Sequence, residues 1–260
     1  MKIAAISLNN RGARLAAALG ASLDAVDVLL HAGVTELPAA PRFHRIADLT
    51  REVFLRYEGL VYVAPMGVVV RAIAPCLRHK TADPAVVAVD AGGRWAVSLL
   101  SGHEGGANEL AIRVANVLGA EPVISSTAEA SKDLIVGVGC RRGAAARSIV
   151  AAVREGLSLA RCDLAHVRML ASAAIKAGEA GLCEAARELN LPLRLIPAEE
   201  IRHTVRAFEH SGFVREKVDL PAVAEPAALL AGRRTRLVLT RQVLHGVAVA
   251  VARESCTLLE

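Results

Sequence analysis

Residues 95–118 read WAVSLLSGHEGGANELAIRVANVL, and this stretch decides how the chain folds. The apolar run from Trp95 to Leu100 predicts a buried strand, and the pattern over residues 107–118 predicts a helix. Between them, residues 101–106 contain three glycines and predict a tight turn. A strand joined to a helix by such a turn indicates an α/β protein.

The turn holds two side chains that can move protons, His103 and Glu104. We predict that one of them activates water for attack on a substrate. Free N–H groups at the start of the following helix carry partial positive charge, so Ser101, Gly105 and Gly106 are expected to contact the same substrate. The alternative for His103 is a turn histidine that is hydrogen-bonded to backbone.

The first half of the chain alternates strands with helices. This pattern predicts an open α/β sheet with ligands bound beyond the carboxyl ends of its strands. Asp48 is the expected N-cap of a helix that runs to about Tyr57, and Gly92-Gly93 predicts a hairpin. The predicted strands are residues 3–8, 26–30, 60–63, 85–90 and 94–100.

Basic residues near this sheet are candidates to bind acidic substrate groups. Arg71 lies in the helix after the third strand, and Lys80 lies in the polar loop before the fourth. The alternative for this loop is a solvated turn in which Asp83 caps the corner at Pro84.

The second half contains another glycine-rich turn, GVGCRRG at residues 137–143, between a strand and a helix. Such a turn can bind an anion. The planar guanidinium groups of Arg141 and Arg142 have the geometry to donate paired hydrogen bonds to carboxylates. The glycine spacing does not fit a dinucleotide-binding motif. Lys176 either pairs locally with Glu179 or projects toward the arginine turn.

Cys140 in the same turn is a second candidate for chemistry. A helix N-terminus and two arginines would lower its pKa and make it a nucleophile, although no partner histidine is identifiable. Further along, a helix is expected over residues 198–206, and closing strands are expected over residues 236–240 and 247–251.

We predict two α/β domains, residues 1–130 and 131–260, each a mostly parallel or mixed sheet flanked by helices. The small, polar segment 125–133 is the predicted linker. Hydrophobic residues make up 53% of the chain and aromatic residues 3%, which suits parallel sheets covered by alanine-rich helices. The segment at the amino end is too short for a signal peptide and no run is long enough to span a membrane, so a cytoplasmic protein is expected.

The five cysteines show no Cys-x-x-Cys spacing, so neither disulfides nor a metal site of the protein's own is expected. The net charge of +5 favours an acidic partner. Dispersed basic residues and few aromatics argue against nucleic acid. A small molecule with several carboxylates fits better.

The chain resembles the CbiG family, the cobalt-precorrin-5A hydrolases of anaerobic cobalamin biosynthesis, and its second half also resembles CobE. Other family members carry an additional middle segment, whereas here the strand at residues 122–124 is followed almost at once by residues 134–140. The resemblance rests on six stretches in family order: residues 67–75, 80–87, 99–111, 137–143, 176–182 and 223–230.

The resemblance implies hydrolysis of the lactone ring of cobalt-precorrin-5A, with release of acetaldehyde and formation of cobalt-precorrin-5B. The cobalt then arrives inside the substrate, and no further cofactor is implied. This chemistry needs a base, with His103 preferred over Glu104, and oxyanion donors, for which the amides of Gly105, Gly106 and Ala107 are available. It also needs cations for the acetates and propionates of the anionic corrinoid, here Arg71, Lys80, Arg141, Arg142 and Lys176.

We expect the histidine turn and the arginine turn to face one macrocycle, with a homodimer and other pathway enzymes as conceivable partners. A non-catalytic carrier or scaffold for corrinoid intermediates is the main alternative. A nucleotide-binding α/β protein, based on the glycine-rich turns alone, is a third.

Overall fold

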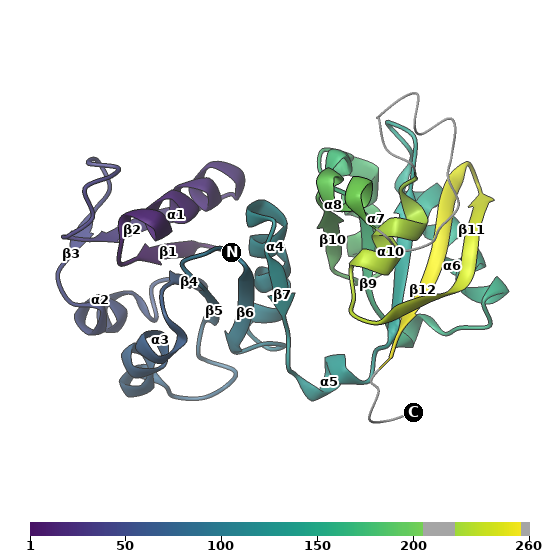
Figure 1. The fold of residues 1–260 in the computed structure, drawn as a ribbon. Helices are drawn as coiled ribbons and strands as arrows, with labels where there is room; N and C mark the ends of the chain where they lie inside the picture. Colours follow the sequence, from purple (N-terminus) through teal and green to yellow (C-terminus); the bar gives the residue numbers. More distant parts are fainter. Residues whose placement is uncertain (205–221, 256–260) are drawn as a thin grey trace. The chain divides into compact units, whose positions relative to one another are not determined.

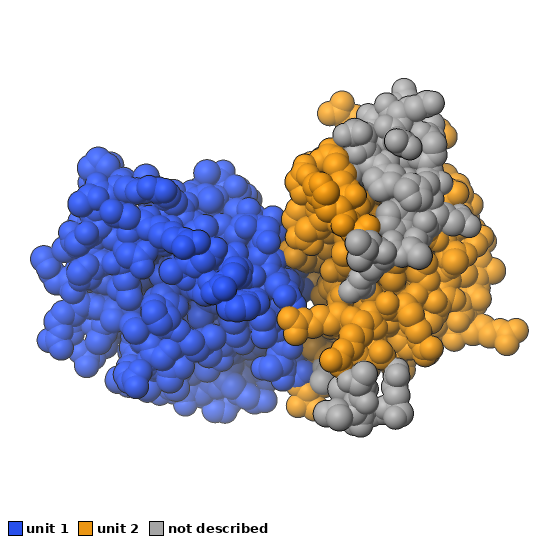
Figure 2. Space-filling view, viewed as in Figure 1, with its two compact units in different colours: residues 1–126 blue, residues 127–260 orange. Residues whose placement is uncertain are grey.

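The computed structural model describes residues 1–204 and 222–255. The chain divides into two compact units, unit 1 over residues 1–126 and unit 2 from residue 127 onward (Figures 1 and 2). The helix α5 (Thr127–Ala130) begins unit 2 and lies within the predicted linker segment.

Unit 1 is built on a seven-stranded sheet in the order β3-β2-β1-β4-β5-β6-β7. Every neighbouring pair is parallel except β5 and β6, which are antiparallel. The predicted hairpin at Gly92-Gly93 joins these two strands, and it reverses the direction of β6 and β7. The strands are β1 (Ile3–Ser7), β2 (Val26–His31), β3 (Arg42–Phe43), β4 (Gly59–Val63), β5 (Ala85–Val89), β6 (Trp95–Leu100) and β7 (Glu121–Val123).

Four helices cover the two faces of this sheet (Figure 1). Alternate residues of β1 explain the two layers, because Ile3 packs with the helices α1 and α4 whereas Ile6 packs with α2 and α3. The helices are α1 (Asn10–Ser22), α2 (Ile46–Val53), α3 (Met66–Ile73) with the short 3-10 turn η1 (Ala74–Cys76), and α4 (Ala107–Leu118).

The predicted bounds of the helix at Asp48 are wrong. The N-cap of α2 is Arg45, three residues earlier, and the helix begins at Ile46 and ends at Val53 rather than near Tyr57. Asp48 lies in its first turn and pairs with Arg51 at 2.9 Å. A carboxylate side chain stabilises a helix both at the N-cap and in the first turn, so the presence of Asp48 alone could not show which of these two positions it occupies.

Unit 2 is built on a five-stranded sheet in the order β10-β9-β8-β12-β11. The strands β8, β9 and β10 are parallel, and β12 runs antiparallel to both β8 and β11. The two sheets thus confirm the predicted α/β class. The strands are β8 (Leu134–Gly139), β9 (Val167–Ala173), β10 (Leu193–Ile196), β11 (Thr235–Leu244) and β12 (Val247–Glu254).

The last two strands are longer than predicted. The expected six-residue connection is a two-residue turn, His245-Gly246, in which both residues have positive φ, 51° and 76°. Such a turn matches the twist of an antiparallel hairpin, so pairing continues to Leu244 on one side and Val247 on the other.

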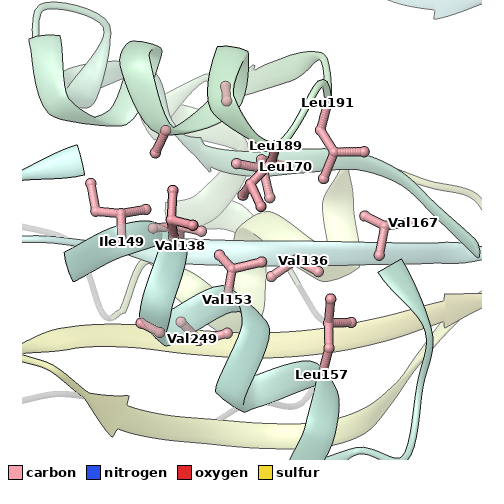
Figure 3. Packing of buried hydrophobic residues seen from close by; sticks show 14 of the residues in the cluster. Val136, Val138, Ile149, Val153, Leu157, Val167, Leu170, Leu189, Leu191 and Val249 are labelled. Atoms are coloured by element: carbon pink, nitrogen blue, oxygen red, sulfur yellow. The ribbon is translucent and has the colours of Figure 1, made fainter. Parts of the chain in front are cut away.

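One face of the second sheet carries α6 (Ala146–Leu159) and α7 (Ala180–Glu188), which bury an aliphatic core that includes Val136 and Val138 (Figure 3). Gly137 lies between these valines and faces the other way, where a Cβ atom would lie 1.9 Å from the Ala224 oxygen. The helix α10 (Ala224–Leu230) therefore packs directly on that backbone. The remaining short helices are α8 (Ala198–His203), η2 (Leu164–His166) and η3 (Ala174–Lys176).

Residues 205 and 206, the end of the helix predicted from Ala198, lie outside the described residues, as does Cys256. Within residues 1–204 and 222–255, no helix is long and apolar enough to cross a bilayer.

Candidate functional site

The turn at residues 101–106 lies at an unexpected edge of the first sheet. It follows the carboxyl end of β6, but Leu100 pairs with Val86 at the amino end of β5. The turn therefore lies beside the amino ends of β1, β4 and β5. The expectation that the site lies beyond the carboxyl ends of these parallel strands is wrong for this turn, because the hairpin before β6 turns the strand around.

The backbone of the turn caps its own helix. Ser101 adopts a φ of 56°, and its carbonyl accepts hydrogen bonds from the amides of Gly105 and Ala107, both at 3.1 Å. The Gly102 carbonyl accepts from the amide of Asn108 at 3.0 Å. The amides of Gly105 and Ala107 are thus already bonded, which differs from the prediction that they are available to an oxyanion.

An ion pair joins this turn to the loop before β5. The Nζ atom of Lys80 lies 2.8 Å from Oε1 of Glu104, on side chains that are 70% and 36% exposed. The hydrogen bond from Lys80 lowers the pKa of Glu104 below its usual value, and the same bond raises the pKa of Lys80. Because a carboxylate with a lowered pKa is a weaker base, this contact favours His103 for proton transfer.

Asp83 has a structural role in the same loop. Its side chain is buried, and its carboxylate accepts from the backbone amide of Arg78 at 3.0 and 3.2 Å. The alternative of a wholly solvated turn is therefore wrong for Asp83, whereas Lys80 is exposed and paired.

His103 is exposed at the tip of the turn, next to Glu104. Arg71 lies elsewhere, because its guanidinium donates back to the Gly67 carbonyl at 2.9 Å, in the first turn of α3 beyond the carboxyl end of β4. The structure thus brings Lys80, His103 and Glu104 together and leaves Arg71 at the other edge.

Asn108 is a site residue that the sequence analysis missed. Its Oδ1 atom accepts from the Ser98 hydroxyl at 2.8 Å, and its Nδ2 atom donates to the Ser126 hydroxyl at 3.1 Å. Together with its backbone bond to Gly102, these contacts join β6, the turn and the end of unit 1. The sequence does place Asn108 in the first turn of a helix that follows a glycine-rich turn, and an asparagine side chain there often hydrogen-bonds to neighbouring groups. This position could have identified Asn108 in advance.

The second candidate turn lies at the carboxyl ends of the parallel strands of unit 2, after β8 and before α6. Residues 140–143 follow β8 and residues 174–179 follow the adjacent parallel strand β9. The carboxylate of Glu179 accepts from the Gly143 amide at 2.9 Å through Oε2 and lies 3.3 Å from the Lys176 Nζ atom through Oε1. Both alternatives for Lys176 and Glu179 thus hold in part, because the two residues pair locally and Glu179 also reaches the arginine turn.

The structure does not support Cys140 as an activated nucleophile, the second candidate for chemistry in this turn. Burial raises the pKa of its thiol above the usual value, and the nearby charge of Lys176 only partly offsets this effect. Arg141 and Arg142 are exposed on the turn. The hydrogen bond from Gly143 lowers the pKa of Glu179, which is held as a carboxylate. The described part of this turn therefore presents charged side chains beside a thiol whose pKa is raised.

Two family models match the chain in sequence order. The cobalamin synthesis G N-terminal model matches residues 48–129, and the cobalamin synthesis G C-terminus model matches residues 134–252. Residues 130–133 alone separate the two matches.

Curated relatives point the same way. A protein named cobalt-precorrin-5A hydrolase from Salmonella typhimurium strain LT2 is 25% identical over 276 aligned residues, which cover 71% of this chain and 79% of the relative. The alignment is longer than the chain's 260 residues, so the relative carries residues without a counterpart here. A protein of the same name from Priestia megaterium is 47% identical over 88 residues, which cover 34% of this chain and 24% of the relative.

A solved structure of CobE, a protein from the cobalamin biosynthetic pathway, is similar to part of the chain. It shares 27% identity with a TM-score of 0.43, over 47% of this chain and 90% of CobE. From its matches to both halves of the family, the chain belongs to the CbiG family of cobalamin synthesis proteins.

Proposed function

We propose that the chain hydrolyses cobalt-precorrin-5A, opening its lactone ring and releasing acetaldehyde to leave cobalt-precorrin-5B. The observation that carries this proposal is the match to both family models, together with relatives named cobalt-precorrin-5A hydrolase. The cobalt is part of the substrate in this proposal, and the protein supplies no metal of its own.

In unit 1, His103 is the proposed base. It takes a proton from water as the water oxygen bonds to the lactone carbonyl carbon, and cleavage of the ester C–O bond then gives a carboxylate and a hydroxyl group. Removal of the hydroxyl proton allows the adjacent carbon–carbon bond to break. The bonding electrons stay with the macrocycle, which takes up a proton, and the two carbons leave as acetaldehyde.

Charge stabilisation falls to Lys80 and to the amide of Gly106, because the amides of Gly105 and Ala107 are bonded to Ser101. A positioned cation beside a developing oxyanion lowers the barrier because it needs little reorganisation. Glu104 then holds Lys80 in place before the substrate arrives.

In unit 2, Arg141, Arg142 and Lys176 are the proposed contacts for the acetates and propionates of the macrocycle. Arginine forks bind carboxylates with two parallel hydrogen bonds, and two of them stand exposed on one turn. Other enzymes of the pathway are the proposed partners for substrate transfer.

The test is an anaerobic incubation of the purified chain with cobalt-precorrin-5A, with acetaldehyde measured by coupled reduction to ethanol. We expect acetaldehyde from the wild-type chain and none from His103→Ala. His166→Ala removes another exposed histidine, in unit 2, and is expected to leave the rate unchanged.

Tight corrinoid binding by the wild-type chain without any acetaldehyde would contradict the hydrolase and support the carrier instead. Acetaldehyde release at the wild-type rate from His103→Ala would keep the hydrolase and remove His103 as its base.

A further inference from the structure

We infer that the turn at residues 139–143 is a carboxylate-binding subsite which the chain's own Glu179 occupies, and that a carboxylate of the bound ligand takes its place. The inference rests on the proposed function in one respect, namely that the ligand is a corrinoid with peripheral carboxylates.

The first observation is the way in which Glu179 is held. One of its oxygens accepts from the backbone amide of Gly143, and the other faces the ammonium group of Lys176. The Glu179 and Lys176 side chains are only 15% and 14% exposed, so the pair is largely removed from water. An amide from one turn and a cation from the next are the donors that an incoming carboxylate would use.

The second observation is that Glu179 does not cap its own helix. It is the N-cap residue of α7, yet its side chain makes no capping hydrogen bond. An N-cap side chain normally accepts from the second or third residue of its helix. Its carboxylate crosses to the turn after β8 instead, so helix capping does not explain its placement.

The third observation is that two cations act on this one carboxylate. The Lys176 Nζ atom lies 3.3 Å from Oε1 of Glu179, and the positive charge of Arg142 also acts on Glu179. Two cations around one carboxylate suit a ligand with several acidic groups.

Glu179 lies beside an open stretch of backbone. Gly178, the preceding residue, is exposed, and a Cβ atom placed on it would meet no other atom within 4 Å. The turn itself keeps its shape, because α7 is pressed against it at Gly181, where a Cβ atom would lie 2.0 Å from the Ala144 oxygen.

The experiment compares two ligands with the same ring. Dicyanocobyrinic acid carries carboxylates at its periphery, and dicyanocobinamide carries amides there, so the pair isolates charge recognition. Dissociation constants are measured by titration calorimetry on the full chain. Glu179→Gln removes the resident charge, Lys176→Met removes the cation, and Glu188→Gln makes the same charge change at an exposed position at the end of α7.

We expect Glu179→Gln to bind the carboxylate ligand about three- to tenfold more tightly, because no internal carboxylate competes for the charge-assisted hydrogen bonds. Lys176→Met is expected to weaken binding of that ligand by a similar factor. Glu188→Gln is expected to match the wild type, and the amide ligand is expected to respond to none of these changes.

Equal or weaker binding of the carboxylate ligand by Glu179→Gln would overturn the inference. If that variant does not fold, unchanged binding by Lys176→Met would overturn it equally. These measurements do not depend on turnover. A chain that binds as expected but releases no acetaldehyde refutes the hydrolase alone, and an active chain with an unresponsive Glu179 refutes the subsite alone.

Discussion

Replacing Gly105 by alanine tests whether the shape of the 101–106 turn sets the activity. A Cβ atom at Gly105 would lie 2.6 Å from Cβ of Ser101, 3.0 Å from the Ser101 oxygen and 3.3 Å from the Ala85 nitrogen. Carbon atoms in contact prefer about 3.5–4.0 Å, so the turn must move by about 1 Å. None of these atoms is the end of a flexible side chain that could rotate away.

The displacement has two expected effects. Overpacking of this kind lowers the free energy of unfolding by about 1–3 kcal/mol. His103 lies between the two residues that clash and moves with the turn, and a misplacement of about 1 Å costs about 100-fold in rate. We therefore expect Gly105→Ala to remain folded but to release acetaldehyde about 100-fold more slowly than the wild type.

The assay pairs acetaldehyde release with urea unfolding followed by circular dichroism. Gly119→Ala is the matched control, because Gly119 ends the same helix with a φ of 65° and has no atom within 4 Å of its Cβ position. It is expected to lose about 1 kcal/mol through its left-handed backbone alone and to keep its rate. A folded Gly105→Ala chain with the wild-type rate would refute the reasoning.

Three further predictions concern the core and unit 2. Tyr62→Phe is expected to lower the free energy of unfolding by about 1–2 kcal/mol, because the buried hydroxyl of Thr50 loses its hydrogen-bond partner at 3.0 Å. Adding Thr50→Val to the same chain should recover most of the lost free energy in urea unfolding, and no recovery would contradict this account. Arg142→Glu is expected to weaken the binding of dicyanocobyrinic acid by about tenfold in calorimetry. Arg187→Glu, at another exposed arginine, is the control. Equal losses of affinity in the two variants would mean that net charge, and not the position of Arg142, sets the binding. Because the folded-state pKa of Glu179 is lowered, its stabilising effect is present above the usual value of 4.5 and is lost as the pH falls through the folded pKa. The urea midpoints of the wild type and Glu179→Gln should therefore converge as the pH is lowered below 4.5, and a gap that persists in acid would contradict the pairing.

Periodicity and glycine placement were enough to predict the α/β class and most strands. Apolar runs such as residues 60–63 and 134–138 are buried strands, as local pattern implies. The hairpin at Gly92-Gly93 was also predicted, but its effect on the site depends on the parallel pairing of β5 with β4, which is distant in the sequence. That pairing is a long-range choice, which the local sequence does not encode.

The candidate site was predicted less completely for the same reason. His103 and Lys80 were both identified, whereas the Lys80–Glu104 contact joins residues 24 positions apart and needed the folded sheet. For Cys140, the sequence shows two neighbouring arginines but not the burial that raises the pKa of its thiol. For Glu179, sequence spacing allowed the pair with Lys176 but gave no sign of the bond to Gly143.

The reversal of β6 also determines where the chain leaves unit 1. Since β7 runs parallel to β6, residue 126 emerges at the same border of the sheet as His103, and Asn108 bonds to Ser126 there. Any segment spliced into residues 127–133 would thus start next to the histidine turn, while the opposite border, beyond Ser7 and Val63, would be untouched. A change in the length of this connection would therefore alter the surroundings of the turn without altering the sheet that supports it.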